Sequence, residues 1–210
     1  MFTIRNELRR DAAAREALLD AAFGEARFTK TAERLREGRL PAHGLSFVAV
    51  GTCSGKTDAG LRKENAADIG STGAGVIGTV RLWNVSAGPD RPALLLGPLA
   101  VATAMRNRGI GAALITHALE TARRLGHASV LLVGDAPYYG RFGFSRERTG
   151  CLWLPGPYER DRLLACELRP DGLASASGLI TAAGRLMPPD LTAPASRIRR
   201  HDSVVAPRAA

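Results

Sequence analysis

One stretch of this sequence, residues 94–125, constrains the fold more than any other part of the chain. Its first half is apolar at successive positions, in Ala93–Leu96 and again in Leu99–Val101, which is typical of a strand covered on both faces. From Gly109 the apolar residues recur with the period of a helix. A buried strand that leads through a glycine turn into an amphipathic helix predicts an α/β fold with the helix packed on the sheet.

Gly97 and Pro98 interrupt the predicted strand. Proline has no N–H to donate to a β-ladder, and a glycine-proline pair within a strand usually marks a bulge or the loss of a neighbouring strand. We therefore expect the sheet to open at this point.

The predicted helix runs from Gly109 to Leu125, and Gly126 is suited to the left-handed residue that follows a helix. Polar residues, among them His117, fall on the side of the helix predicted to face solvent. The apolar stripe that should face the sheet consists of Ile110, Leu114, Ala118, Ala122 and Leu125.

The hexapeptide Arg106-Asn107-Arg108-Gly109-Ile110-Gly111 has the chemistry of an anion site. Gly109 and Gly111 let backbone N–H groups approach a phosphate without an intervening Cβ, and the helix start carries roughly half a positive charge. Arg106 and Arg108 add full charges. A glycine-rich turn with two solvated arginines is the alternative, because a short glycine motif is not specific by itself.

This hexapeptide matches the R/Q-x-x-G-x-G/A signature of the GCN5-related N-acetyltransferase (GNAT) superfamily. Downstream, Tyr138-Tyr139-Gly140-Arg141-Phe142-Gly143-Phe144 resembles the FYEKLGF segment of that family. The segments GPLAV, GDAPYYGRFGF and LPGPYERDRLLACEL are most similar to its YhbS-like branch of predicted acetyltransferases. The resemblance covers about residues 4–168, and two motifs in the right order are more specific than one.

For the fold, the resemblance implies a mixed α/β sheet of six to seven strands, with splayed central strands and helices on both faces. In the GNAT family the signature begins the helix whose N-terminus binds the pyrophosphate of acetyl-CoA, which is therefore the implied cosubstrate, with no metal. The implied cofactor-binding residues are Leu99, Ala100 and Val101 beside the pantetheine arm, and Arg106, Asn107, Arg108, Gly109, Ile110 and Gly111 at the pyrophosphate.

The resemblance also implies a reaction, the transfer of an acetyl group to a primary amine by direct attack through a tetrahedral intermediate. A backbone N–H near Val101 would stabilise the oxyanion. Tyr139 occupies the position of the family tyrosine that protonates the departing thiolate, whereas Tyr138 falls on a packing position. A purely local packing role for the Tyr139 ring is the alternative. The acceptor, a small molecule or a peptide, is not specified, because loops such as 51–75 and 155–162 would select it.

The sequence does not identify the general base. Many family members use a glutamate on the central strand, but no acidic residue lies between Arg91 and Thr116. A water chain or Asp135 remain as alternatives, and Asp135 is also placed to cap the short helix that follows it. The absent glutamate leaves a second function open, a non-catalytic acyl-CoA-binding or regulatory module with the same fold.

Composition narrows the function classes. The formal charge of +9 suits a polyanionic cosubstrate as well as a nucleic acid, but the basic residues are scattered rather than gathered with aromatics, so we expect no nucleic-acid partner. Without a run of about eighteen apolar residues or the apolar stretch of a signal peptide, a cytoplasmic protein with no membrane attachment is expected. Whether the chain forms a homodimer is left open.

Cys53, Cys151 and Cys166 form no CxxC pair, which argues against disulfides or zinc.

One domain is expected over residues 1–170, followed by an extension over 171–210 that is largely disordered beyond about 186. Residues 51–75 are expected to form a long mobile loop, and its Gly51–Thr57 segment has one residue too few between its glycines for a P-loop.

Trp83 is expected in the core and His127 at the surface. The predicted strands cover 2–5, 45–50, 76–83, 129–133, 151–154 and 163–168 besides the central one, and the other helices cover 11–23, 31–39 and 138–142.

Overall fold

The computed structural model describes residues 1–51 and 75–188. The interior of the predicted 51–75 loop, which contains Cys53 and most of the segment compared with a P-loop, lies outside the described residues. The part of the predicted extension beyond residue 188 lies outside them as well.

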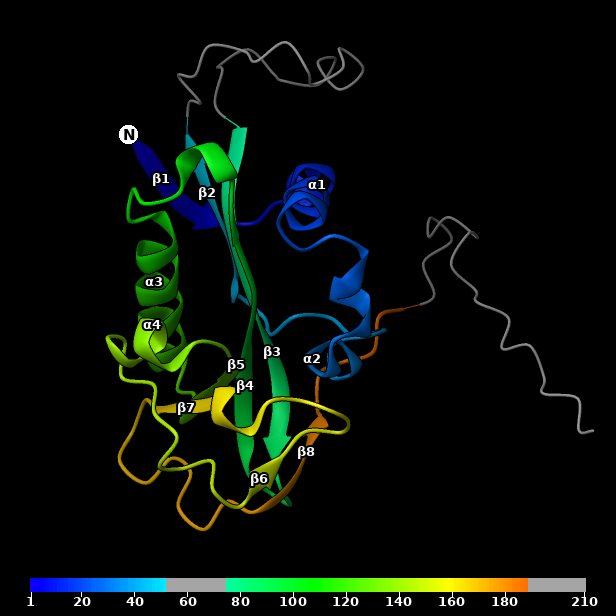
Figure 1. Ribbon diagram of the computed structural model, residues 1–210, viewed down its shortest axis with the longest axis vertical. Coiled ribbons are helices and arrows are strands. Elements are labelled where there is room, and N and C mark those ends of the chain that lie inside the picture. The colour runs from blue at the N-terminus through cyan, green and yellow to red at the C-terminus, as the bar shows by residue number, and fades with distance from the viewer. Residues whose placement is uncertain (52–74, 189–210) are drawn as a thin grey trace, which may run out of the picture.

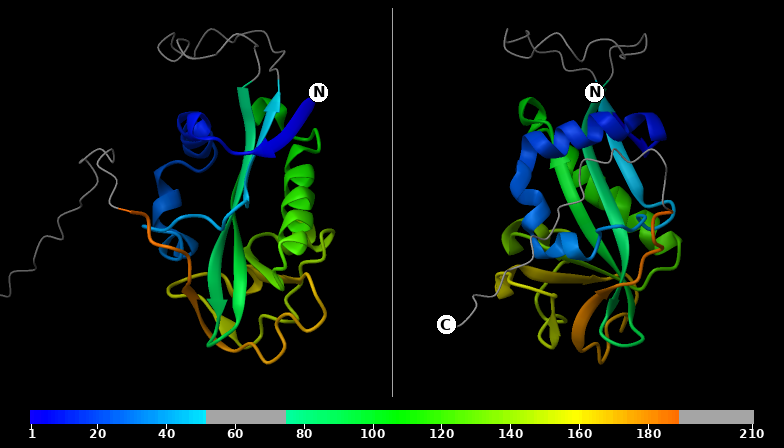
Figure 2. Two further views of the ribbon diagram at one scale, coloured as in Figure 1. Left: turned by 180° about the vertical axis from the view of Figure 1, so that it is seen from behind. Right: turned by 90° about the vertical axis from the view of Figure 1, so that its right-hand side faces the viewer.

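A mixed sheet forms the centre of the molecule, with the strand order β1-β2-β3-β4-β5-β7 and with β8 paired to both β3 and β6. Helices α1 and α2 cover one face of this sheet and α3 and α4 the other, which confirms the predicted architecture (Figures 1 and 2). The strands are β1 (Phe2–Asn6), β2 (Ser46–Gly51), β3 (Gly75–Ala87), β4 (Pro92–Val101), β5 (Ser129–Val133), β6 (Leu152–Trp153), β7 (Leu163–Glu167) and β8 (Gly178–Ala182). The α-helices are α1 (Ala12–Phe23), α2 (Thr31–Arg34), α3 (Ile110–Arg124) and α4 (Ala136–Gly140), and 3-10 helices cover Arg9–Asp11, Glu25–Thr29, Thr103–Met105 and Arg160–Arg162.

The central strand β4 is paired unequally on its two sides. Antiparallel β3 accompanies it from Pro92 to Val101, with a register shift that accommodates an extra residue at Gly97 and Pro98. Parallel β5 pairs only with Leu94 and Leu95, so within the described chain the β5-facing edge of residues 96–101 has no strand partner. The bulge and the opening predicted from the Gly-Pro pair are confirmed.

A buried tryptophan holds this bulge in place. The indole N–H of Trp83, on β3, donates a 2.6 Å hydrogen bond to the carbonyl oxygen of Gly97. The side chain is 8% exposed, so Trp83 lies in the core as predicted. Because a buried carbonyl without a donor is costly, this bond stabilises the opened edge of β4.

Helix α3 has nearly the predicted bounds, and Gly126 follows it with a φ of 88°. Two of its side chains were predicted wrongly. Leu125 is 53% exposed, because it lies at the helix end where the chain turns away from the sheet. His117 is half-buried, with its ring edge-on to Phe47 at 4.7 Å between centroids. The buried face of α3 also includes Ile115 and Leu119, and is therefore wider than the predicted stripe.

The predicted helix over 31–39 is wrong in length. Helix α2 covers only Thr31–Arg34, and the chain then continues in turns, because Gly38 adopts a left-handed φ of 65°. The Glu37 N–H still bonds four residues back to Glu33, but the Arg39 N–H bonds only three residues back to Arg36, as in a turn.

The sheet has eight strands rather than the six or seven predicted, because β8 lies in the segment after residue 170. Val85, Ser86 and Ala87 of β3 pair with β8, which explains why β3 continues past its predicted end at Trp83. Ile180 of β8 is fully buried in the core that β3, β4 and β6 share. The first part of the predicted extension therefore belongs to the packed structure.

Candidate active site

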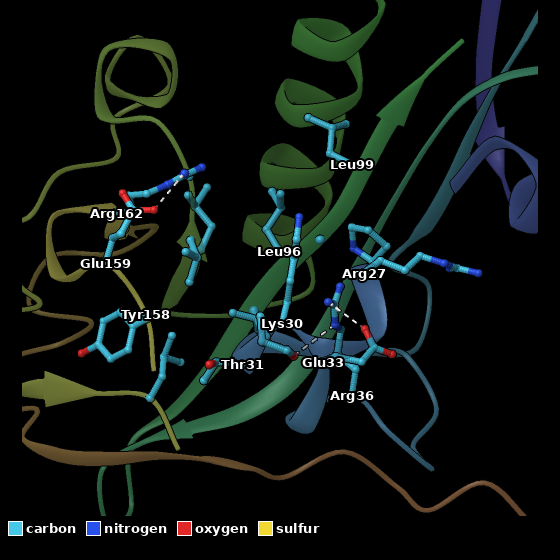
Figure 3. A pocket seen from close by; sticks show the side chains of 18 of the residues that line it. Arg27, Lys30, Thr31, Glu33, Arg36, Leu96, Leu99, Tyr158, Glu159 and Arg162 are labelled. Atoms are coloured by element: carbon cyan, nitrogen blue, oxygen red, sulfur yellow. Dashed lines mark hydrogen bonds and ion pairs between the residues drawn. The ribbon is translucent and has the colours of Figure 1, made fainter. Parts of the chain in front are cut away.

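A cavity of about 480 Å³ lies where β4 parts from β5. Its walls come from five segments: the edge of β4 at 95–99, the end of β5 at 132–135, Tyr139 of α4, the residues from the end of α1 through α2, and the loop at 154–162 (Figure 3). The loop predicted to select the acceptor thus contributes to this cavity. α1 and α2 lie on the same face of the sheet, so the residues from α2 that line the cavity come from that face (Figure 2).

The predicted pantetheine-binding residues lie along the open edge of β4. Leu99 lines the cavity, whereas Ala100 is buried beneath α1. Val101 points toward the start of α3, since its Cγ2 atom is 3.7 Å from the position that a Cβ on Gly111 would take. The structure therefore brings the end of β4 and the glycine hexapeptide, the two predicted binding segments, next to each other.

The start of α3 has free backbone donors. Asn107 and Gly109 have left-handed φ values of 61° and 75°, and Gly109 is the N-cap, with no side-chain cap bond. The first intrahelical acceptor is the Gly109 carbonyl, bonded by the Ala113 N–H, so the preceding N–H groups of the first turn have no partner within the helix. This is the geometry of an anion site at a helix N-terminus.

The side chains of the hexapeptide differ in what they offer to a ligand. Arg106, Asn107 and Arg108 are exposed, and neither guanidinium makes an ion pair with a described residue. The Ile110 side chain is 1% exposed in the core, so only its backbone N–H is available. A Cβ on Gly109 would meet no atom within 4 Å, which leaves space beside the free N–H groups.

Tyr139, on α4, lines the cavity from the β5 side. Its ring rests on the backbone of Gly134, where a Cβ would lie 2.3 Å from the ring carbon Cε2, and it packs edge-on to Phe144. Burial, and secondarily the neighbouring Tyr138, raise the pKa of Tyr139 to about 12. No described residue hydrogen-bonds its hydroxyl group, so this group keeps its proton near neutral pH and has a free donor.

Asp135 acts as the N-cap of α4. Its side chain accepts a 3.2 Å hydrogen bond from the Tyr138 backbone N–H, as predicted for a capping residue. The same side chain also lines the cavity. The cap role does not consume all of its acceptor sites, so Asp135 remains available to a water molecule or an acceptor.

The position of Tyr138 was not anticipated from the sequence, which indicated packing alone. Its hydroxyl oxygen lies 3.1 Å from the Cβ position of Gly111, at the start of α3, and the Arg141 guanidinium stacks 4.3 Å from its ring centroid. No sequence pattern marks Tyr138 as a residue that meets the start of α3, because only the packing of α4 against α3 brings its hydroxyl group next to Gly111.

Sequence reasoning also missed the charged residues of the cavity. Most come from the segment around α2, and two come from the 154–162 loop, where Arg162 is 3.6 Å from Glu159. No motif marks them, since they are far apart in the sequence. They are Arg27, Lys30, Glu33, Arg36, Glu159 and Arg162 (Figure 3).

The remaining candidates lie outside this cavity. His127 is half-buried rather than at the surface, and burial together with Arg169 lowers its pKa. Cys166 is buried and Cys151 exposed, and neither forms a disulfide with a described residue. Among the described residues no group of three or more His, Cys, Asp or Glu side chains could hold a metal ion. No described helix is long and apolar enough to cross a bilayer.

This fold and this site define a class of protein. A family model of the acetyltransferase (GNAT) domain matches residues 66–146, which include β4, α3, β5 and α4. A crystal structure of the GNAT family N-acetyltransferase YhbS from Escherichia coli in complex with CoA has a TM-score of 0.65 and 29% identity, over 87% of this chain and 89% of that chain. Residues 66–146 thus match the acetyltransferase (GNAT) domain, and the chain is similar in fold to a solved structure of that family.

Among individual proteins, the chain is similar to the uncharacterized N-acetyltransferase YhbS of Escherichia coli K12, with 30% identity over 109 residues. The match covers 50% of this chain and 64% of that relative, less than two thirds of its length. A GNAT family acetyltransferase from Brucella melitensis in complex with acetyl-CoA has 25% identity and a TM-score of 0.57, over 87% and 96% of the two chains. The resemblance to the GNAT family and its YhbS-like branch is confirmed.

Proposed function

We propose that this protein is an N-acetyltransferase that transfers an acetyl group from acetyl-CoA to a primary amine of a small molecule or peptide. One observation carries the proposal: the unpaired edge of β4 runs from the uncapped start of α3 to a cavity that Tyr139 lines. Two structural relatives, solved in complex with CoA and with acetyl-CoA, support it.

In this proposal the chain binds the cosubstrate through two sets of backbone groups. The N–H groups of residues 109–111 bind the diphosphate, and the exposed Arg106 and Arg108 neutralise its charge. Residues 99–101 of β4 pair with the amides of the pantetheine arm in place of a neighbouring strand. Bound acetyl-CoA supplies an acetyl group activated as a thioester.

Tyr139 is the proposed general acid. Like any tyrosine it is protonated at neutral pH, so it can donate to a sulfur on which charge develops, although the raised pKa makes it a weaker acid than a free tyrosine. The rigid contacts of its ring with Gly134 and Phe144 fix the direction of the hydroxyl group, which matters more here than matching of pKa values.

The proton of the amine needs an acceptor. β4 carries no acidic residue, but three carboxylates from other segments line the cavity: Glu33, Asp135 and Glu159. Asp135 is nearest in sequence to Tyr139 and keeps a free acceptor site beside its cap bond. A carboxylate of this group, directly or through water, is the proposed base, and the absence of a β4 glutamate then does not favour a non-catalytic module.

The test is release of free thiol from acetyl-CoA in the presence of a panel of primary amines. We expect turnover by the wild-type protein and a loss of about a hundredfold in kcat for Tyr139→Phe. Calorimetric affinity for acetyl-CoA should be the same for both proteins, because the substitution removes only a hydroxyl group. Binding without thiol release for every amine would instead identify an acyl-CoA-binding module, and full activity of Tyr139→Phe would remove its assigned role.

A further inference from the structure

Arg36 is a charged side chain buried in the wall of the cavity. It is 9% exposed, and burial lowers the pKa of its guanidinium group while the charge of Glu33 opposes this shift. Its Nη1 atom lies 3.8 Å from the position that a Cβ on Gly97 would take, at the bulge of β4. Figure 3 shows its guanidinium group beside Glu33 and Lys30 on this wall.

The partners of Arg36 all belong to its own segment. Its Nε atom donates to the Ala32 carbonyl at 3.2 Å, and its Nη2 atom is 2.9 Å from a carboxylate oxygen of Glu33. Nη1 has no hydrogen-bond partner among the described residues. A guanidinium group has five donors, so a large part of the hydrogen-bonding capacity of Arg36 is unused.

Other arginines of this protein connect separate elements. Arg34 donates to the carbonyl of Pro155, Arg39 to that of Gly184, and Arg123 to that of Leu168. Among the described residues Arg36 makes no such connection, although burial is the largest influence on its pKa and desolvating a charge is costly. A role in holding the fold together therefore does not explain it, whereas an unused donor facing a cavity is suited to an incoming ligand.

Glu33 restricts the charge of that ligand. Arg27 and Lys30 also line this cavity and attract anions. The Glu33 carboxylate, 29% exposed and beside Arg36, repels an anionic group placed next to it. It would attract an ammonium group. A monoanionic carboxylate on Arg36 with an ammonium group near Glu33 satisfies both partners, and planar guanidinium groups match carboxylates well.

We propose that Arg36 and Glu33 form the acceptor subsite, and that the acceptor is a small zwitterion whose carboxylate binds Arg36 while its amine lies near Glu33. The acceptor class is thus that of amino acids and short peptides with a free carboxylate. This inference rests on the proposed acetyl transfer, and it adds the chemical class of the acceptor.

The experiment compares the free amino acids with their carboxamides as acceptors, measured by thiol release from acetyl-CoA. We expect the wild-type protein to prefer the carboxylate member by roughly ten- to hundredfold in kcat/KM, which is typical of a hydrogen bond to a charged group. Arg36→Met should reduce this ratio to near one by raising KM for the carboxylate members. The substitution removes one partner of the ion pair with Glu33, which lowers stability, but the Glu33 side chain is 29% exposed and can be solvated, so the variant should still fold.

Arg39→Met is the matched control, because Arg39 bonds a carbonyl outside the cavity and should keep the wild-type preference. If Arg36→Met does not fold, Arg36→Gln replaces it with the same expected loss of preference. Equal use of acids and carboxamides by the wild type, no use of either set, or a preference that survives in Arg36→Met would overturn the proposal. Acetyl-CoA affinity, measured by calorimetry on the same proteins, tests the proposed function separately. If the wild-type protein does not bind acetyl-CoA, the proposed acetyl transfer itself is overturned.

Discussion

At the scale of single residues, the position of Tyr139 depends on a glycine that faces it. A Cβ at Gly134 would overlap the tyrosine ring, so the ring can lie flat on the end of β5 only because no side chain is there. The sequence predicted Tyr139 as the acid from its place in a motif. It could not predict the burial that raises its pKa, because that burial depends on how α4 packs against the hydrophobic core.

The raised pKa of Tyr139 predicts an alkaline dependence of stability. The unfolded tyrosine ionises near pH 10 and the folded one near pH 12, so between these values the unfolded state loses its proton first. The free energy of unfolding should therefore be unaffected below pH 10 and should fall above it, by up to about 1.4 kcal/mol per pH unit. Urea titrations between pH 9 and 12 measure this slope.

Tyr139→Phe should remove that part of the slope, and Tyr158→Phe is the control, because it also removes one tyrosine hydroxyl group from the wall of the cavity. An identical alkaline slope in the wild type and in Tyr139→Phe would contradict the buried, protonated hydroxyl group. The comparison is needed because other groups also titrate in this range.

At the scale of elements, the central observation concerns β4. It pairs with β5 only at Leu94 and Leu95, and its unpaired end at Val101 lies beside the start of α3. The Gly-Pro pair indicated the opening, and the change of apolar period indicated the helix. Both predictions were local and both are confirmed. The short α2 was predicted too long, since helical periodicity continues through Leu35 but the left-handed Gly38 and the turns before it end the helix.

Gly109→Glu should abolish measurable acetyl-CoA binding, because it places a carboxylate beside the free N–H groups at the start of α3. The matched control is Gly109→Asn, since asparagine tolerates the left-handed φ of 75° and carries no charge. We expect calorimetry to show a much smaller loss for the asparagine variant. Unchanged affinity of Gly109→Glu would show that the diphosphate binds elsewhere.

At the scale of the whole molecule, the C-terminal segment completes the sheet. β8 covers the end of β3, and Ile180 is fully buried there while the adjacent Leu179 is 41% exposed. Sequence analysis did not predict this strand. A five-residue strand with one buried side chain gives too weak an alternation to be recognised, and only its pairing with β3 and β6 stabilises it.

Ile180→Ala should destabilise the protein by about 2–5 kcal/mol, because it leaves a cavity in a packed core. Leu179→Ala, one position away on the exposed side of the strand, should change stability by less than about 0.5 kcal/mol. Urea denaturation measures both. Equal effects of the two substitutions would mean that β8 is not part of the cooperative structure.

The sequence by itself determined the elements that depend on near neighbours: the buried strand with its bulge, the helix start with free N–H groups, and the tyrosine motif. Periodicity, glycine conformation and capping operate within about one turn or one strand, so they can be read along the chain. Only the tertiary structure decided that Tyr138 meets Gly111, that β8 joins the sheet, and that Arg36 and Glu33 face Tyr139 across one cavity. These contacts join segments up to about a hundred residues apart, and their free energy comes from burial and pairing, which no local pattern encodes.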